Sequence, residues 1–294
     1  VARGLASTRS QAQRLIADGV QWQRFSSAGE EWKTVAKNGD EVPDDAPVRL
    51  LNDAEARYVS RGGLKLEAAL KQVGLQVTGL ACLDVGQSTG GFTDCLLKHG
   101  ARSVVGVDVG SAQLHPSLRA DPRVLCVEKV NARALTASDL IAAYEESTGA
   151  DGQFSLEEGE PDDEGDVDQT SEFAPEFDLI VVDLSFISQT LVLPALVPLL
   201  KMGGTLLTLV KPQFELQPGQ VGKGGIVKDA AYFPLIEQRL REGGAGLVNA
   251  EVQVIALLVP PAQERGHGSF QECGHHACGY LTGGGAPGPP APHA

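Results

Sequence analysis

Two charged residues directly follow apolar runs that are typical of buried strands. Asp183 comes after Leu179-Ile-Val-Val182, and Lys211 comes after Leu206-Leu-Thr-Leu-Val210. The carboxyl ends of parallel strands line the ligand crevice of a sheet, so these two side chains could pair there. The carboxylate would hold the lysine in place while burial disfavours its charged form, and the amine could then accept a hydroxyl proton. The alternatives are a helix cap for Asp183 and a lysine that reaches solvent at the sheet edge.

A glycine-rich turn joins an apolar strand to a helix within residues 82–94, Cys-Leu-Asp-Val-Gly-Gln-Ser-Thr-Gly-Gly-Phe-Thr-Asp. Its glycines would let the backbone approach a ligand closely. One strand later, Asp108 ends an apolar run, where it could accept both ribose hydroxyls of a nucleoside cofactor. The turn reads Gly-x-x-x-Gly-Gly and lacks the pyrophosphate fingerprint Gly-x-Gly-x-x-Gly. We therefore expect S-adenosylmethionine, which has no phosphate; a tight turn without a ligand is the alternative. The candidate cofactor contacts are Asp84, Gly86, Ser88, Thr89, Gly90, Gly91, Phe92, Asp108, Val109 and Asn131.

These residues need a sheet that brings strand ends together. Apolar strands alternate with helical stretches from residue 80 onward, and strands this apolar are typical of a parallel sheet covered on both faces. We expect a doubly wound, mostly parallel α/β sheet. The predicted strands are 81–85, 103–108, 124–127, 178–183, 205–210 and 252–259. The segments with lengths suited to crossover helices are 91–99, 136–146, 189–200 and 229–243.

The first part of the chain is typical of a small α+β module. Residues 5–19 predict a helix that ends at a glycine, with Arg9 and Arg14 facing outward. Its buried stripe consists of Ala12, Leu15 and Ile16. Short strands are predicted around 20–22, 32–35 and 48–51. Paired glycines at 62 and 63 then break the chain before the larger domain.

The charge of the chain is concentrated in one segment. The 294 residues carry a formal net charge of −14, which argues against a nucleic-acid partner if it is spread evenly. Residues 151–176, however, contain eleven Asp or Glu and no Lys or Arg, which leaves the rest of the chain at −3. We interpret this run as a solvated insertion without regular structure.

Several protein classes are disfavoured by composition. No apolar run approaches the roughly 20 residues of a membrane-spanning helix, and the start carries no secretory signal, so we expect a cytoplasmic protein. The five cysteines do not resemble a disulfide framework. A cluster of Cys and His at 273–278 lacks a second ligand pair, so we expect no metal. Residues 266–294, rich in Gly, Pro and His, predict a tail without a packed element.

Five segments, taken in order, resemble the motifs of the TlyA family, and the similarity runs from about Ala2 to about Val259. They are 58–66 (Tyr-Val-Ser-Arg-Gly-Gly-Leu-Lys-Leu), 84–94, 183–188 (Asp-Leu-Ser-Phe-Ile-Ser), 211–215 (Lys-Pro-Gln-Phe-Glu) and 225–229 (Gly-Ile-Val-Lys-Asp). Members of this family carry the name haemolysin but act as ribosomal RNA 2′-O-methyltransferases related to the FtsJ-type enzymes. The first helix is similar to that of a small RNA-binding domain first described in a ribosomal small-subunit protein, although the usual opening strand is missing.

The resemblance implies a Rossmann-like class I methyltransferase that uses S-adenosyl-L-methionine on ribosomal RNA or ribosomal subunits, with a cytidine ribose as the target. It implies a small RNA-binding domain at 1–52, a linker at 53–63, a methyltransferase domain at 64–265 with the acidic insertion, and the tail. The implied RNA contacts are Arg9, Arg14 and Arg61.

The resemblance also implies a Lys-Asp-Lys-Glu catalytic set. Lys65, Asp183 and Lys211 lie in matching motifs, and Glu272 is the candidate for the fourth member, although Gly268-Ser-Phe-Gln-Glu272 only partly matches the Gly-Asn-x-Glu-like segment of the family. Gln87, where the family usually has a small residue, is a further departure.

A ribose hydroxyl is a weak acid, so its proton must be removed as it attacks a methyl group. We assign that proton transfer to Lys211, the orientation of the amine to Asp183, and the positioning of the ribose to Lys65. Two rival functions stay open. A membrane-active cytolysin would need an apolar or basic amphipathic segment that the sequence lacks, and a ribosome-binding protein without catalysis would explain the atypical end.

Overall fold

The computed structural model describes residues 2–6, 9–26, 29–51, 56–149, 173–223, 227, 229, 231–244, 253–258 and 277–281. The chain divides into two compact units. The first contains Val1–Leu75 and Thr89–Cys95, and the second contains Gln76–Ser88 and Leu96–Ala294.

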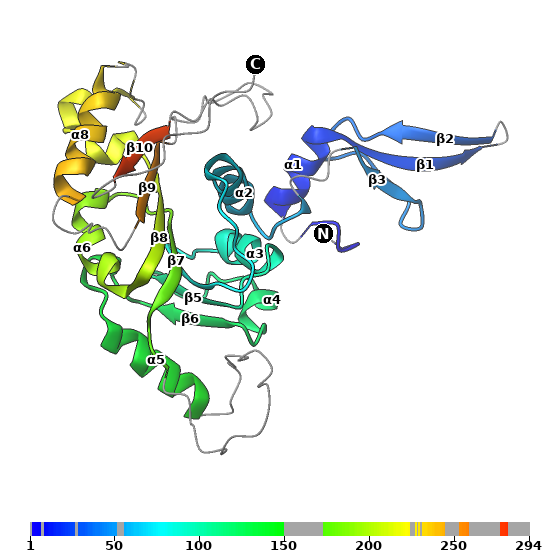
Figure 1. Ribbon diagram of the computed structural model, residues 1–294. Helices are drawn as coiled ribbons and strands as arrows, with labels where there is room; N and C mark the ends of the chain where they lie inside the picture. The colour runs from blue at the N-terminus through cyan, green and yellow to red at the C-terminus, as the bar shows by residue number, and fades with distance from the viewer. Residues whose placement is uncertain are drawn as a thin grey trace. The chain divides into compact units, whose positions relative to one another are not determined.

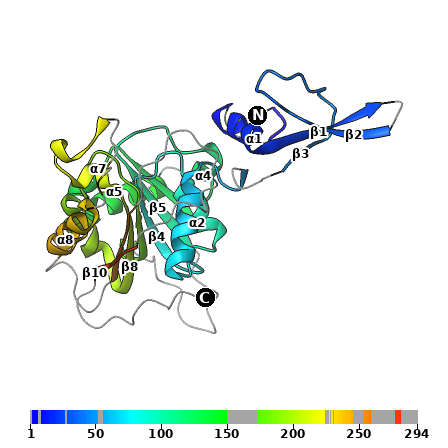
Figure 2. The same cartoon turned by 90° about the horizontal axis from the view of Figure 1, so that it is seen from above.

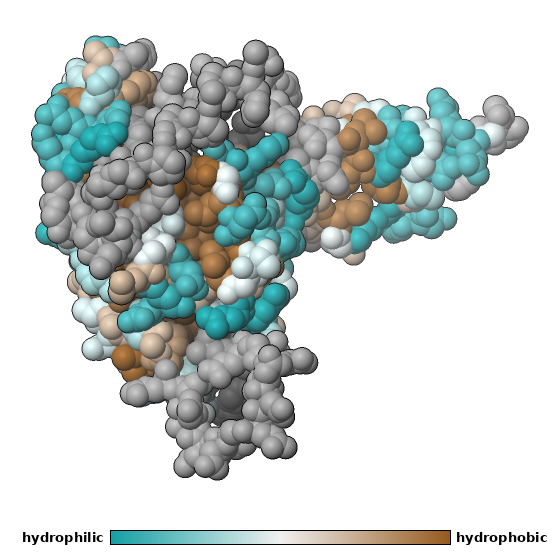
Figure 3. Space-filling model, viewed as in Figure 1, coloured by the Kyte–Doolittle hydropathy of each residue, from teal (hydrophilic) through white to brown (hydrophobic). Residues whose placement is uncertain are grey.

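The small N-terminal module of the first unit is a helix packed on a three-stranded antiparallel sheet. It consists of α1 (Arg9–Gly19), β1 (Val20–Ser26), β2 (Gly29–Thr34) and β3 (Val48–Leu50), and the strand order is β2-β1-β3. Leu15 of α1 packs with Val20 and Val35 in its core, as the predicted stripe requires. Figure 3 shows hydrophilic residues over much of the β1–β2 hairpin and hydrophobic residues nearer to α1, in agreement with a core on the helix side.

Helix α2 (Gly62–Val73) follows in the same unit. A Cβ atom on Gly63 would lie 2.3 Å from Cγ of the buried Tyr58, so only glycine allows the helix to begin against this ring. The N–H of Val59 donates to the Asp94 carboxylate at 2.8 Å. The 58–63 segment is thereby fastened to the first turn of α3 (Gly91–Lys98).

The second unit is built on a seven-stranded sheet with the order β10-β9-β8-β7-β4-β5-β6. All neighbouring strands are parallel except β10, which runs antiparallel to β9. The strands are β4 (Ala81–Val85), β5 (Ser103–Asp108), β6 (Val124–Glu128), β7 (Phe177–Val182), β8 (Leu200–Val210), β9 (Gln253–Leu258) and β10 (Ala277–Leu281). This is the predicted doubly wound, mostly parallel α/β sheet.

The α-helices of this unit that complete the fold are α4 (Pro116–Arg119), α5 (Ala137–Gly149), α6 (Leu193–Leu196), α7 (Pro212–Glu215) and α8 (Tyr232–Gly244). Short 3-10 turns are η2 (Ala132–Ala134), η3 (Gln189–Leu191), η4 (Val197–Leu199) and η5 (Pro218–Gln220). Both Figure 1 and Figure 2 show α5 and α8 on the same side of the strands.

Both faces of the sheet are buried. The core on one face joins strand residues such as Ile180 and Leu206 to Leu140 of α5, Leu196 of α6 and Leu240 of α8. The alternate strand residues, which point to the other face, are buried as well; they include Cys82, Val104, Leu179 and Leu207. Burial on both sides explains why these strands are apolar at nearly every position.

Two regions differ from the sequence-based expectation. The predicted crossover helix at 189–200 is broken into η3, α6 and η4, with Pro194 and Pro198 at the starts of the latter two. Proline has no N–H to donate and interrupts a longer helix. Strand β10 lies within 266–294, where no packed element was expected. It forms by pairing with β9, and local composition does not reveal such a long-range pairing.

The acidic residues 151–172 and Glu272 lie outside the described residues. Among the helices that the structure does describe, none combines the length and the hydropathy needed to cross a membrane.

Candidate active site

Asp183 and Lys211 form an ion pair where two neighbouring parallel strands end. Asp183 follows β7 and Lys211 follows β8, and these strands pair from Phe177↔Leu200 to Val182↔Thr208. Lys211 Nζ lies 2.7 Å from Asp183 Oδ1, and the two side chains are only 17% and 15% exposed. Nζ also donates to the hydroxyl of Ser185 at 2.7 Å. The pairing predicted from the strand ends is present, and its low exposure limits screening by salt.

The glycine turn after β4 packs directly against the segment that carries Asp183. Gly86 has a φ of +93°, and a Cβ atom there would lie 2.9 Å from the backbone oxygen of Asp183. Its N–H donates to Val107 O at 2.9 Å. Gly90 also has a positive φ, +92°. The turn therefore needs glycine at 86 both for its backbone conformation and for its approach to the neighbouring loop.

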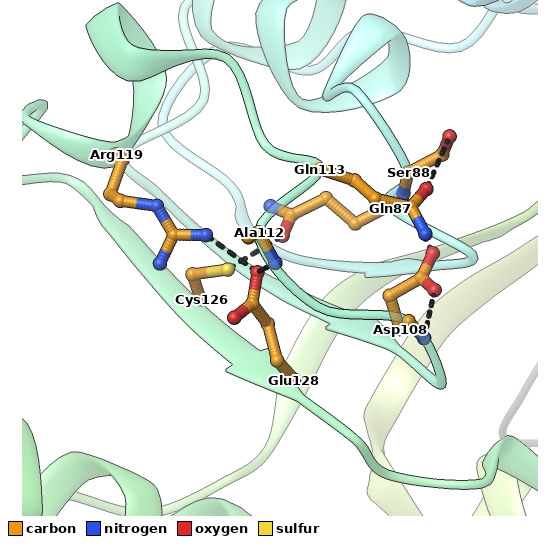
Figure 4. A network of polar contacts seen from close by, with 9 residues as sticks. Gln87, Ser88, Asp108, Ala112, Gln113, Arg119, Cys126 and Glu128 are labelled. Atoms are coloured by element: carbon orange, nitrogen blue, oxygen red, sulfur yellow. Dashed lines mark hydrogen bonds and ion pairs between the residues drawn. The ribbon is translucent and has the colours of Figure 1, made fainter.

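Asp108 organises the other side of the same turn. Its carboxylate accepts the N–H of Ser88 at 2.7 Å through Oδ2 and the N–H of Gly110 at 2.7 Å through Oδ1. Ser88 is held at a φ of +48°, a conformation that non-glycine residues rarely adopt. Figure 4 shows Asp108 and Ser88 with Gln113, which receives the Ser88 hydroxyl at 3.4 Å.

The arrangement at Asp108 fits a nucleoside cofactor. A carboxylate has about four lone-pair sites, so two backbone hydrogen bonds leave acceptor capacity for two ribose hydroxyls. Asp108 is half-buried and Val109 is 73% exposed, so both are open to a ligand. The chemistry of the donor set therefore agrees with the cofactor expected from the sequence.

The remaining candidate cofactor residues have varied surroundings. Asp84 and Phe92 are buried, whereas Thr89 is exposed. Gly91 packs closely inside the first unit, because a Cβ atom there would lie 2.3 Å from the Ser60 hydroxyl oxygen. Asn131 caps η2 by accepting the Arg133 N–H at 3.0 Å. The structure brings Ser88 to Asp108 and Gly86 to Asp183; binding roles for the other candidates stay predictions.

The remaining catalytic and RNA-binding candidates include several residues of the first unit. Lys65 is half-buried in α2, and Arg61 is exposed directly before that helix. Arg9 is exposed at the start of α1, and Arg14 lies in the same helix. Their assigned roles stay predictions, as does that of Glu272.

Gln87, the departure from the family pattern, is accommodated by a glycine on the next strand. The residue is 3% exposed, and Cys126 Sγ donates to its Oε1 at 3.2 Å. A Cβ atom on Gly106 would lie 1.8 Å from Gln87 Nε2. Burial, ahead of neighbouring charges, raises the pKa of Cys126 to about 11, so this thiol stays protonated at neutral pH. Figure 4 shows Gln87 and Cys126 in this network.

Three side chains that the sequence motifs did not single out also connect the two strand-end segments: Ser185, Ser188 and Glu215. Ser185 contacts Lys211 Nζ, while Glu215 accepts hydrogen bonds from Ser188 Oγ and from the N–H of Gln189. The available signal was their presence in the polar segments after β7 and β8. That signal does not single out three residues among so many polar neighbours.

Comparison with known proteins identifies the family. The FtsJ-like methyltransferase family matches residues 58–248. The 16S/23S rRNA (cytidine-2′-O)-methyltransferase TlyA of Mycobacterium tuberculosis is 40% identical over 229 residues, which cover 78% of this chain and 70% of that protein. YqxC of Bacillus subtilis is 39% identical over 229 residues, which cover 78% of this chain and 67% of that protein. The solved structure of a hemolysin-type protein from Lactococcus lactis has a TM-score of 0.52 and 35% identity, over 70% of this chain and 81% of that one. The chain belongs to the FtsJ-like methyltransferase family, in its TlyA group.

Proposed function

We propose that this protein is an S-adenosylmethionine-dependent methyltransferase that modifies a ribose 2′-hydroxyl of ribosomal RNA, with cytidine as the target nucleotide. The observation that carries the proposal is the Asp183–Lys211 pair, which lies beside the glycine turn. A proton acceptor and a cofactor-binding turn in adjacent loops are what methyl transfer to a hydroxyl requires. The sequence identity with TlyA supports the choice of substrate.

The residues that hold S-adenosylmethionine follow from the turn. Asp108 accepts the ribose hydroxyls, and the backbone around Gly86 and Gly90 lines the ligand. Val109, largely exposed directly after Asp108, offers an apolar contact to the adenine. When bound, the cofactor supplies an electrophilic methyl group. S-adenosylmethionine contains no phosphate, in keeping with the absence of a pyrophosphate fingerprint.

Lys211, once it has released its own ammonium proton to solvent, removes the proton of the attacking hydroxyl as a neutral amine. Its amine is held by Asp183 and Ser185, both at 2.7 Å, so its direction is fixed before substrate arrives. Proton transfer by a positioned group is worth about 10²–10⁴-fold in rate. Lys65 positions the ribose or stabilises the negative charge that develops on it.

The RNA is recruited by the N-terminal module at 1–52. Arg9 and Arg14 of α1, together with Arg61 in the linker, contribute positive charge for the phosphate backbone. The partners are then ribosomal subunits, and the protein works in the cytoplasm, where ribosomes are found.

Transfer of a tritiated methyl group to ribosomal subunits, followed by mass-spectrometric mapping of the modified ribose, tests the function. Wild-type protein should methylate a ribose 2′-hydroxyl of ribosomal RNA, and Lys211→Ala should lose about 10²-fold or more of the rate. Lys201→Ala is the matched control, because Lys201 pairs with Asp178 at 3.0 Å at the opposite end of β7. Wild-type protein that binds S-adenosylmethionine and labels no ribose would contradict the proposal.

A further inference from the structure

The segments after β7 and β8 are connected a second time, beyond the Lys211 contacts. Glu215 ends α7, four residues after Lys211. Its Oε2 accepts the hydroxyl of Ser188 at 2.5 Å, and its Oε1 accepts the N–H of Gln189 at 2.8 Å. One carboxylate therefore holds the far end of the loop whose near end carries Asp183.

Glu215 is almost fully buried. Removing a carboxylate from water costs free energy unless hydrogen bonds compensate for the lost solvation. The residue is 7% exposed, and burial raises the pKa of its carboxyl, although the hydrogen bonds from Ser188 and Gln189 act in the opposite direction. A guanidinium nitrogen of Arg239 in α8 donates to its backbone oxygen at 2.7 Å. Both the side chain and the backbone of Glu215 are thus fixed. An apolar residue would fill the same place without the desolvation cost of a carboxylate.

Resting on the methyl transfer proposed above, we propose that Glu215 is a positioning residue for that reaction. It fixes the loop after β7 against the segment after β8, and so keeps Asp183 and Ser185 in contact with the Lys211 amine. Glu215 itself contacts no reacting atom. A displacement of a catalytic group by about 1 Å can cost about 10²-fold in rate, so a residue that holds both segments affects turnover more than binding.

The test uses full-length protein with ribosomal subunits and S-adenosylmethionine. Glu215→Ala should lower kcat about 10- to 10²-fold, while the KM for RNA and the Kd for S-adenosylmethionine change by less than about twofold. Glu215→Gln keeps the shape and one acceptor oxygen. It should therefore restore part of kcat, and it provides a readout if the alanine variant folds poorly.

The matched control is Asp178→Ala, at the other end of β7. Asp178 also makes two polar contacts, with Lys201 at 3.0 Å and with the N–H of Ala81 at 2.8 Å. Its loss should reduce the free energy of unfolding and leave kcat within about twofold of wild type. A purely structural role for Glu215 would produce this same pattern.

A double-mutant cycle with Ser188→Ala separates the loop connection from other effects. If Glu215 acts through Ser188, the double variant should have nearly the kcat of Glu215→Ala alone. Glu215→Ala already removes the hydrogen bond between the two side chains, so Ser188→Ala has nothing further to remove. Additive effects on log kcat, an unchanged kcat in Glu215→Ala, or a change confined to KM would overturn the inference. An inactive wild type would instead contradict the methyltransferase function itself.

Discussion

Gly86 lies against the backbone oxygen of Asp183, and a Cβ atom on residue 86 would stand 2.9 Å from it. The same hypothetical atom would lie 3.1 Å from a methyl carbon of Leu184. The turn expected to hold the cofactor and the loop that carries the ion-paired carboxylate therefore determine each other's position. A substitution in the glycine turn should therefore shift the backbone at Asp183, and a substitution in the loop after β7 should shift the turn.

Gly86→Ala should impair both cofactor binding and catalysis. The added methyl group meets the backbone of Asp183, and the φ of +93° is strained for alanine. We expect a loss of about 1–3 kcal/mol in the free energy of unfolding and weaker binding of S-adenosylhomocysteine by calorimetry. Gly203→Ala is the matched control, because Gly203 has a φ of +77° but nothing within 4 Å of its Cβ position. If both variants bind the cofactor product as wild type does, the proposed coupling is wrong.

Asp108→Asn should weaken cofactor binding by about 10- to 10²-fold, because a hydrogen bond to a charged group is worth about 1.5–3 kcal/mol. The amide keeps one acceptor oxygen but cannot accept from both Ser88 and Gly110 through oxygen atoms. Calorimetric titration with S-adenosylhomocysteine measures the change. Asp121→Asn, which removes a charge paired with Arg123 at 2.8 Å, is the control. Equal affinity in wild type and Asp108→Asn would exclude Asp108 as a ribose ligand.

Much of the large sheet could be predicted because each central strand is buried on both faces. β4 and β5 begin and end at the predicted residues, since a continuous apolar run has sharp limits at the turns that flank it. The 189–200 segment could not be predicted in the same way. Its prolines allow several short turns, and the observed path packs Val192 and Leu196 into the core.

The candidate site likewise contains contacts that the sequence predicts and contacts that it does not. The Asp183–Lys211 pair could be predicted because parallel neighbours bring their carboxyl ends to one edge of a sheet. The Ser188–Glu215 hydrogen bond could not, because it depends on the lengths and paths of two loops rather than on strand register. Gln87 illustrates a third case. Its fit depends on a glycine in another strand, and sequence spacing does not reveal that contact.

Glu215 should make the stability of the protein depend on pH in an unusual direction for a carboxylate. Burial raises its pKa in the folded state above the ordinary value of 4.5, so the folded protein holds this proton more tightly than the unfolded chain. The contribution is fully present below the unfolded pKa and is lost as pH rises through the folded pKa. Chemical denaturation from about pH 4 to pH 8 should show that Glu215→Gln removes a decline in stability present in wild type. A decline of the same size in both proteins would contradict this.

The Gln87–Gly106 contact predicts a pair of compensating substitutions. Gly106→Ala places a methyl group 1.8 Å from the Gln87 amide nitrogen inside a buried region, and overpacking of this kind costs about 1–3 kcal/mol. Gln87→Ser in the same chain removes the obstructing amide, so the double variant should regain most of the lost stability. Thermal unfolding of wild type, both single variants and the double variant measures the coupling. Gly219→Ala, with nothing within 4 Å of its Cβ position, controls for the substitution itself. If Gln87→Ser fails to rescue Gly106→Ala, the glycine in β5 is required by some other neighbour, and the side chain of Gln87 is not what makes it necessary.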